Sequence, residues 1–229
     1  DKFRHFRMVD LTELKWSLFF GLNECPYIHL LNCLVINKND FAIKGYLSEF
    51  AEYGSLESFI FKNNNINYSD LLNGLIHVAK GIHFLHDRKI LHGDIHSGNI
   101  LVFPRANNGN GFIMKLTDFG CSCLFDDHSP YEYDAEFNSF KEKILNEYSS
   151  KEEQNSKLYQ KIAKEDWYFY SRLLRYITYC VKKYHGVILI KIKMLSYLLT
   201  GKALDQENIL QTIQQYCEES IEIIKRSES

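Results

Sequence analysis

The chain has 229 residues, of which 45% are hydrophobic and 24% are charged, with 12 glycines and only 3 prolines. This composition is typical of a folded globular chain and excludes a disordered segment or a small disulfide-stapled scaffold. The formal net charge of −2 gives no overall positive field, so neither nucleic acid nor an anionic membrane surface is an expected partner. The longest apolar run, residues 186–190, is much shorter than the roughly 18 residues that a membrane span needs. Because no secretory h-region follows the charged N-terminus, we expect a cytoplasmic or nuclear location.

The first 50 residues combine one helical pattern with two short strands. Apolar residues at Leu11, Leu14 and Leu18 fall on one face of a helix over residues 11–20. Two apolar runs, 30–37 and 41–50, are joined by the polar stretch that ends at Asp40, and this arrangement predicts a β-hairpin.

The remainder of the chain is predominantly helical. Apolar residues recur at intervals of three and four from Asp70 onwards, which predicts a long helix that ends near residues 87–89. Short strands are expected at 100–103 and 112–116, with a glycine- and asparagine-rich turn between them. Three more helices are expected, over residues 166–183, 187–199 and 205–225. The pattern predicts an α+β fold in which a small strand-rich part precedes a large helical part.

Three side chains that bear oxygen atoms follow short apolar strands. Asp94 and Asn99 lie in the polar loop after one strand, and Asp118 follows the strand over 112–116. Mg²⁺ prefers hard oxygen ligands and completes its octahedron with water and phosphate oxygens, so one carboxylate and one amide are sufficient. A further carboxylate can orient a hydroxyl nucleophile and accept its proton. The sequence therefore predicts a magnesium and phosphate site.

The order and spacing of these residues resemble the eukaryotic protein-kinase superfamily. The run His-Gly-Asp at 92–94, with Asn99, resembles the H-R-D-L-x-x-x-x-N catalytic loop with Gly in place of Arg, and Asp-Phe-Gly at 118–120 resembles D-F-G. Residues 49–56 resemble the hinge between the lobes. The pair Asp-Trp at 166–167 resembles the start of the buried helix whose Asp anchors the catalytic-loop backbone.

The resemblance implies ATP and Mg²⁺ as cofactors and a role for each residue of the motifs. Asp94 would be the catalytic base, and Asn99 and Asp118 would hold Mg²⁺. His96 would stand where Ser/Thr kinases commonly have a lysine that contacts the γ-phosphate.

The same resemblance implies a nucleotide site at the hinge. Backbone groups of Glu49 and Ala51 would meet the adenine edge, Ser55 would lie near the ribose, and Leu101 would pack under the ring. Thr117, just before the D-F-G motif, is assigned to the same site.

The implied domain organisation is a partial N-lobe over residues 1–50 and a helical C-lobe over 51–229, with an insert at about 126–165. A Gly-rich loop is not evident, and the nearest candidates for the usual Lys–Glu pair are Lys2 and Glu13, at a shorter spacing than in the family. Gly93 in place of Arg disfavours control through a phosphorylated activation loop. The insert is expected to form one or two charged surface helices, and the sharper hypothesis is that it docks a protein.

Three functions remain open at this stage. The first is a divergent protein kinase that transfers the ATP γ-phosphate to a Ser or Thr hydroxyl of a protein substrate. The second is a pseudokinase that acts as a nucleotide- or protein-binding scaffold, and the third is a small-molecule kinase of the aminoglycoside or choline type. A protein substrate or a scaffold partner is therefore expected, whereas the oligomeric state is left open.

Overall fold

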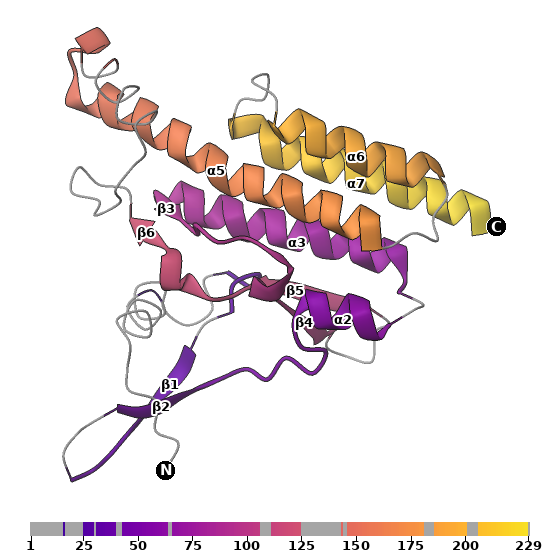
Figure 1. Ribbon diagram of the computed structural model, residues 1–229, viewed down its shortest axis with the longest axis horizontal. Helices are drawn as coiled ribbons and strands as arrows, with labels where there is room; N and C mark the ends of the chain where they lie inside the picture. The colour runs from indigo at the N-terminus through magenta and orange to yellow at the C-terminus, as the bar shows by residue number, and fades with distance from the viewer. Residues whose placement is uncertain are drawn as a thin grey trace.

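The computed structural model describes Trp16 and residues 25–29, 31–39, 43–63, 66–105, 111–124, 143, 146–180, 186–200 and 206–228. In this part of the chain, long helices pack together and three two-stranded sheets lie on one side of them (Figure 1). The mixture of a few strands with a larger helical part confirms the predicted α+β fold class.

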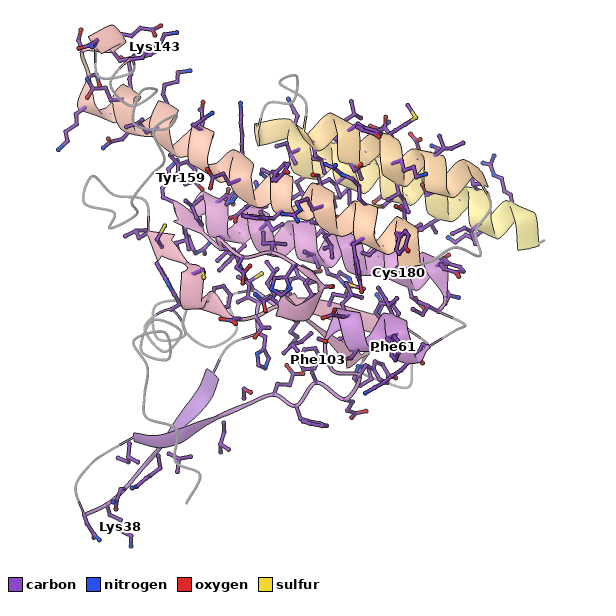
Figure 2. The ribbon with its side chains drawn as sticks, in the orientation of Figure 1. Lys38, Phe61, Phe103, Lys143, Tyr159 and Cys180 are labelled. Carbon is purple, nitrogen blue, oxygen red and sulfur yellow. The ribbon has the colours of Figure 1, made fainter. Side chains whose placement is uncertain are left out.

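The predicted N-terminal hairpin is present. Strand β1 (Leu31–Ile36) pairs antiparallel with β2 (Ile43–Ser48), with Leu34 opposite Tyr46. The Asn37 side chain accepts a hydrogen bond from the Asn39 amide at 3.2 Å, which is the local turn chemistry that the polar linker predicted. The hairpin extends away from the helices, with Lys38 near its tip (Figures 1 and 2).

A short helix and a long helix follow the hairpin. Helix α2 (Leu56–Lys62), which the sequence analysis did not predict, begins after Ser55, whose hydroxyl accepts a hydrogen bond from the Ser58 amide. Helix α3 (Tyr68–Asp87) begins two residues before the predicted start because the Asn67 side chain caps it by accepting from the Asp70 amide at 3.1 Å.

A β-hairpin packs directly against α3. Strands β4 (Ile100–Pro104) and β5 (Phe112–Leu116) are antiparallel, with Val102 opposite Met114, as predicted. A Cβ added to Gly74 of α3 would lie 2.6 Å from the Met114 Cε atom, so a glycine at this position lets the strand approach the helix closely.

Helix α5 (Lys151–Cys180) begins fifteen residues earlier than the sequence predicted. The helix runs without a break through residue 165, across the predicted end of the insert. Three side chains near its start, Leu158, Tyr159 and Ala163, are buried against the small sheet of β3 (Ile90–Leu91) and β6 (Cys123–Leu124). The expected charged surface helix is therefore present from residue 151, with Lys151, Glu152 and Glu153 exposed, but this segment also packs part of its surface against the rest of the chain.

Helices α6 (Gly186–Thr200) and α7 (Gln206–Glu228) complete the helical layer, close to their predicted bounds. Both pack on the same side of the molecule as α5 and α3 (Figure 1). Among the described residues, no helix is both long enough and apolar enough to cross a membrane.

Some sequence predictions concern residues outside the described part. The helix over 11–20 is described only at Trp16, which is helical and buried and donates a hydrogen bond to the Ser122 carbonyl at 3.1 Å. Lys2, Glu13 and most of residues 126–145 lie outside it. The division into lobes at residue 50 stays a prediction.

Candidate active site

The loop that carries Asp94 is anchored by hydrogen bonds to Asp166 of α5. The Asp166 carboxylate, 1% exposed, accepts hydrogen bonds from the backbone amides of His92 and Gly93, each at 2.9 Å, and from His86 Nε2 at 3.0 Å. Burial acts to raise the pKa of Asp166, but the hydrogen bonds and the neighbouring imidazoles outweigh it and hold the pKa below its ordinary value. The predicted anchoring role of Asp166 is confirmed.

His92 connects this loop to the strand that precedes Asp118. Its Nε2 lies 3.1 Å from the Thr117 carbonyl, which can only accept, so Nε2 carries a proton and donates. Nδ1 accepts from the Asp94 amide at 3.3 Å. Complete burial lowers the pKa of His92, although nearby carboxylates oppose the effect, so the ring is neutral at neutral pH. Gly93 has a φ of +80°, a conformation that favours glycine over the family's usual arginine.

Asp94 and Asn99 lie in direct contact. The Asn99 amide nitrogen donates to Asp94 Oδ2 at 2.9 Å and to the Asp94 carbonyl at 3.0 Å. Both of its hydrogens are therefore used on Asp94, and Asn99 Oδ1 has no hydrogen-bond partner in the part of the chain that the structure describes. The amide oxygen is thus oriented and available to a cation.

His96 lies beside the same carboxylate. Its Nδ1 accepts from the Gly98 amide at 3.0 Å, so in the neutral ring the proton is on Nε2, which lies 3.4 Å from Asp94 Oδ2. The His96 side chain is 53% exposed. The arrangement leaves Asp94 Oδ1, which has no hydrogen-bond partner among the described residues, to accept a proton from a bound hydroxyl.

Asp118 follows β5 and adopts a left-handed backbone conformation with a φ of 62°. Its carboxylate accepts from the Gly120 amide at 3.1 Å, while the amide of the preceding Thr117 donates to the Asn99 carbonyl at 3.0 Å. Burial raises the pKa of the Cys121 thiol, and the negative charges of Asp94 and Asp118 raise it further. A non-glycine residue at positive φ is costly and is common at functional sites.

These residues fit a magnesium ion bound with a nucleotide. The Asn99 amide oxygen and one Asp118 carboxylate oxygen have no hydrogen-bond partner among the described residues, and both are hard donors. In the described part of the chain, no group of three or more His, Cys, Asp or Glu side chains could hold a metal ion without other ligands. A Mg²⁺ ion held here would take its remaining ligands from water and phosphate.

The predicted hinge residues lie along one edge of the β4–β5 hairpin. Gly54, at a φ of +71°, closes a turn by donating to the Ala51 carbonyl at 2.9 Å, and its own carbonyl accepts from the Val102 amide at 2.9 Å. Ser55 pairs with the half-buried Leu101 in an isolated β-bridge. Gly54 and the predicted ribose residue Ser55 are thereby held next to β4.

The sequence analysis missed His29, which lies between the hinge and β5. Its Nε2 is 3.0 Å from the Glu49 carbonyl oxygen, and its Nδ1 is 3.2 Å from the Thr117 hydroxyl. His29 lies outside the motifs, so its position became evident only from contacts 20 and 88 residues away along the chain.

Comparison with known proteins places the chain in one family. A family profile described as "Protein tyrosine and serine/threonine kinase" matches residues 21–225. The chain belongs to the protein kinase family, and the resemblance seen in its motifs is confirmed.

Individual relatives are more distant and much longer. The "Fibroblast growth factor receptor" of Hydra vulgaris is 30% identical over 105 residues, which cover 41% of this chain and 12% of that protein. The "RGS domain-containing serine/threonine-protein kinase A" of Dictyostelium discoideum is 35% identical over 114 residues, or 49% of this chain and 9% of that protein. The chain thus spans a small part of the length of these relatives.

Among solved structures, a chain of the "yeast RNA Pol II CTD kinase CTDK-1 complex" is similar, with 23% identity and a TM-score of 0.45. The similarity covers 56% of this chain and 38% of that chain.

Proposed function

We propose that this kinase domain binds ATP with Mg²⁺ and transfers the γ-phosphate to a Ser or Thr hydroxyl of a protein. The observation that carries the proposal is the contact between Asp94 and Asn99, which leaves one carboxylate oxygen and one amide oxygen available on neighbouring side chains. A base and a metal ligand held side by side are what phosphoryl transfer requires, because its catalysis consists mainly of positioning and charge stabilisation.

In this proposal each residue has a defined part in the reaction. Asn99 and Asp118 hold Mg²⁺, which neutralises charge on the phosphate oxygens when it is bound. Asp94 orients the substrate hydroxyl and accepts its proton as the hydroxyl oxygen bonds to the γ-phosphorus and the bond to the β–γ bridging oxygen breaks. The His96 imidazole, whose Nε2 lies 3.4 Å from Asp94 Oδ2, stands where Ser/Thr kinases commonly have a lysine that contacts the γ-phosphate.

Nucleotide binding is tested first, by thermal unfolding with and without Mg·ATP. A ligand at about 100 times its Kd adds about 2.7 kcal/mol of stability, which for a domain of this size corresponds to a Tm increase of about 5–10 °C. The variant Asp118→Asn should lose this shift. A matched control is Asp87→Asn, which makes the same change at an exposed residue of α3 and should keep the full shift.

Phosphate transfer is tested with labelled ATP and a panel of protein substrates. Loss of a general base costs on the order of 10²- to 10⁴-fold in rate, so Asp94→Asn should reduce incorporation by about this factor while the Mg·ATP shift remains. Transfer that survives this change at the original rate would show that Asp94 is not the base.

One observation favours the second function, a pseudokinase that acts as a protein-binding scaffold. The segment before Asp166, which in the family forms part of the protein-substrate platform, is here the first half of a continuous helix buried through Leu158 and Tyr159. A Tm that does not change at millimolar Mg·ATP would favour this function over catalysis.

A further inference from the structure

The hinge residue Glu49 is fastened to the end of β5 in two independent ways. Its backbone carbonyl lies 3.0 Å from His29 Nε2, and its carboxylate forms an ion pair with Lys115 of β5. The Lys115 ammonium also lies 4.7 Å from the centre of the ring of Phe103, on the paired strand β4 (Phe103 is labelled in Figure 2).

The direction of each hydrogen bond of His29 follows from its partners. A carbonyl oxygen can only accept, so Nε2 must carry a proton and donate to Glu49. Burial lowers the pKa of His29, and the ring is therefore neutral at neutral pH. Its Nδ1 is then an acceptor, and the Thr117 hydroxyl donates to it across 3.2 Å. A single tautomer thus satisfies both contacts.

The backbone around His29 is fixed to the same strand. The His29 amide donates to the Leu116 carbonyl at 2.7 Å, and the Leu116 amide donates to the Tyr27 carbonyl at 2.9 Å. The His29 ring, 9% exposed, also lies against Phe103, with 5.7 Å between ring centres. The imidazole is therefore a rigid connection between β5 and the hinge.

We propose that His29 is a positioning residue for the nucleotide. With Glu49, Lys115 and Thr117 it forms a connection, here called the hinge latch, that fixes the Glu49 carbonyl relative to the residue preceding Asp118. A carbonyl oxygen has two lone pairs, so the bond from His29 leaves Glu49 one acceptor position for the purine edge. The purine end and the metal end of the site are thereby held at one separation before any nucleotide binds, which reduces the ordering cost of binding. The inference rests on the proposed nucleotide binding and adds a residue outside the kinase motifs.

The latch itself is tested without nucleotide, by hydrogen–deuterium exchange of the hinge amides in the peptide that spans residues 46–54. His29→Leu removes both side-chain hydrogen bonds, and Thr117→Val removes one of them while preserving side-chain shape. One hydrogen bond contributes on the order of 1 kcal/mol, so Thr117→Val should raise hinge exchange by about fivefold, and His29→Leu, which removes two bonds, should raise it by more.

A matched control is His77→Leu, which makes the same change at a comparably buried histidine of α3. Its ring stacks on Tyr27, and its Nδ1 accepts a hydrogen bond from the Met114 amide at 3.5 Å, so neither contact involves the side chains of Glu49, Lys115 or Thr117. This variant should leave hinge exchange within about twofold of the original rate, even if it lowers Tm.

The role in nucleotide positioning is tested by calorimetric titration with two probes, Mg·ATP and Mg·tripolyphosphate, which has no purine. The latch predicts that His29→Leu weakens Mg·ATP binding by about tenfold and changes Mg·tripolyphosphate binding by less than about twofold. A general loss of structure would weaken both probes alike.

The outcomes separate this inference from the proposed function. Unchanged hinge exchange in both latch variants overturns the latch. Equal weakening of the two probes, or a His29→Leu variant that binds Mg·ATP as tightly as before or more tightly, overturns its role in purine positioning. If the unsubstituted protein binds neither probe, the proposed nucleotide binding is overturned, and the positioning role with it. The exchange measurement still decides whether the latch exists.

Discussion

Asp166 offers the sharpest quantitative test of how this site is built. The change Asp166→Asn keeps the size of the side chain but replaces one acceptor oxygen by an NH₂ group. At least one of the three groups that donate to Asp166, the two amides of His92 and Gly93 and the His86 imidazole, would then face another donor. The bonds that remain would lose the contribution of the negative charge.

The expected cost is about 3 kcal/mol of unfolding free energy, because a buried donor left without an acceptor costs 1–3 kcal/mol and bonds to charged groups are the stronger ones. This is a large fraction of the 5–15 kcal/mol that typically stabilises a domain. Because the pKa of Asp166 is held below its unfolded value, the contribution is present above about pH 4 and is lost as the pH falls further.

The assay is urea unfolding at pH 7, followed by far-UV circular dichroism. Asp166→Asn should lower the transition midpoint without changing the m-value, and exposed Asp87→Asn should change the free energy by less than about 0.5 kcal/mol. A double-mutant cycle with His86→Leu should show a coupling energy above about 0.5 kcal/mol. A loss below 1 kcal/mol for Asp166→Asn would refute the argument that this carboxylate fixes the catalytic loop.

Three other changes probe the packing that supports the site. Burial, and after it the nearby positive charges, lowers the pKa of His77 to about 4, so as the pH falls the unfolded chain binds a proton at this residue before the folded chain does. The contribution of neutral His77 to the unfolding free energy is complete above about pH 6.5 and is lost as the pH falls, by up to about 3 kcal/mol near pH 4. His77→Leu should flatten this part of a pH series of urea unfolding. Tyr159→Phe removes the 2.8 Å hydrogen bond to the His86 carbonyl and should lower Tm by about 2–4 °C in a calorimetric scan, with no change if the first half of α5 is only loosely attached. Gly74→Val forces Met114 away from α3 and should cost about 2 kcal/mol in urea unfolding; Met114→Ala in the same chain should recover part of that loss, and full tolerance of Gly74→Val alone would contradict the close approach.

The elements predicted most accurately are those whose signals are local. The strands at 100–104 and 112–116 agree with prediction within one residue, because an apolar run and a glycine-rich turn specify a hairpin without help from the rest of the chain. Helix α2 was missed because seven residues are too few to show a clear helical period.

The start of α5 was misplaced for a different reason. Charged residues dominate its first half, and the buried side chains there, Leu158, Tyr159 and Ala163, are too few to form a distinct apolar stripe. The cluster that they join also includes Leu91 and Cys123, which are far away in the sequence.

The order of Asp94, Asn99 and Asp118 along the chain was sufficient to predict a metal and phosphate site, because the chemistry of oxygen ligands and the spacing of the motifs are properties of the sequence. The contacts of His29 with Glu49 and Thr117 were decided only by the tertiary structure. A local sequence pattern indicates the chemistry that a side chain can perform. A hydrogen bond between residues 88 positions apart forms only after packing has brought their backbones together.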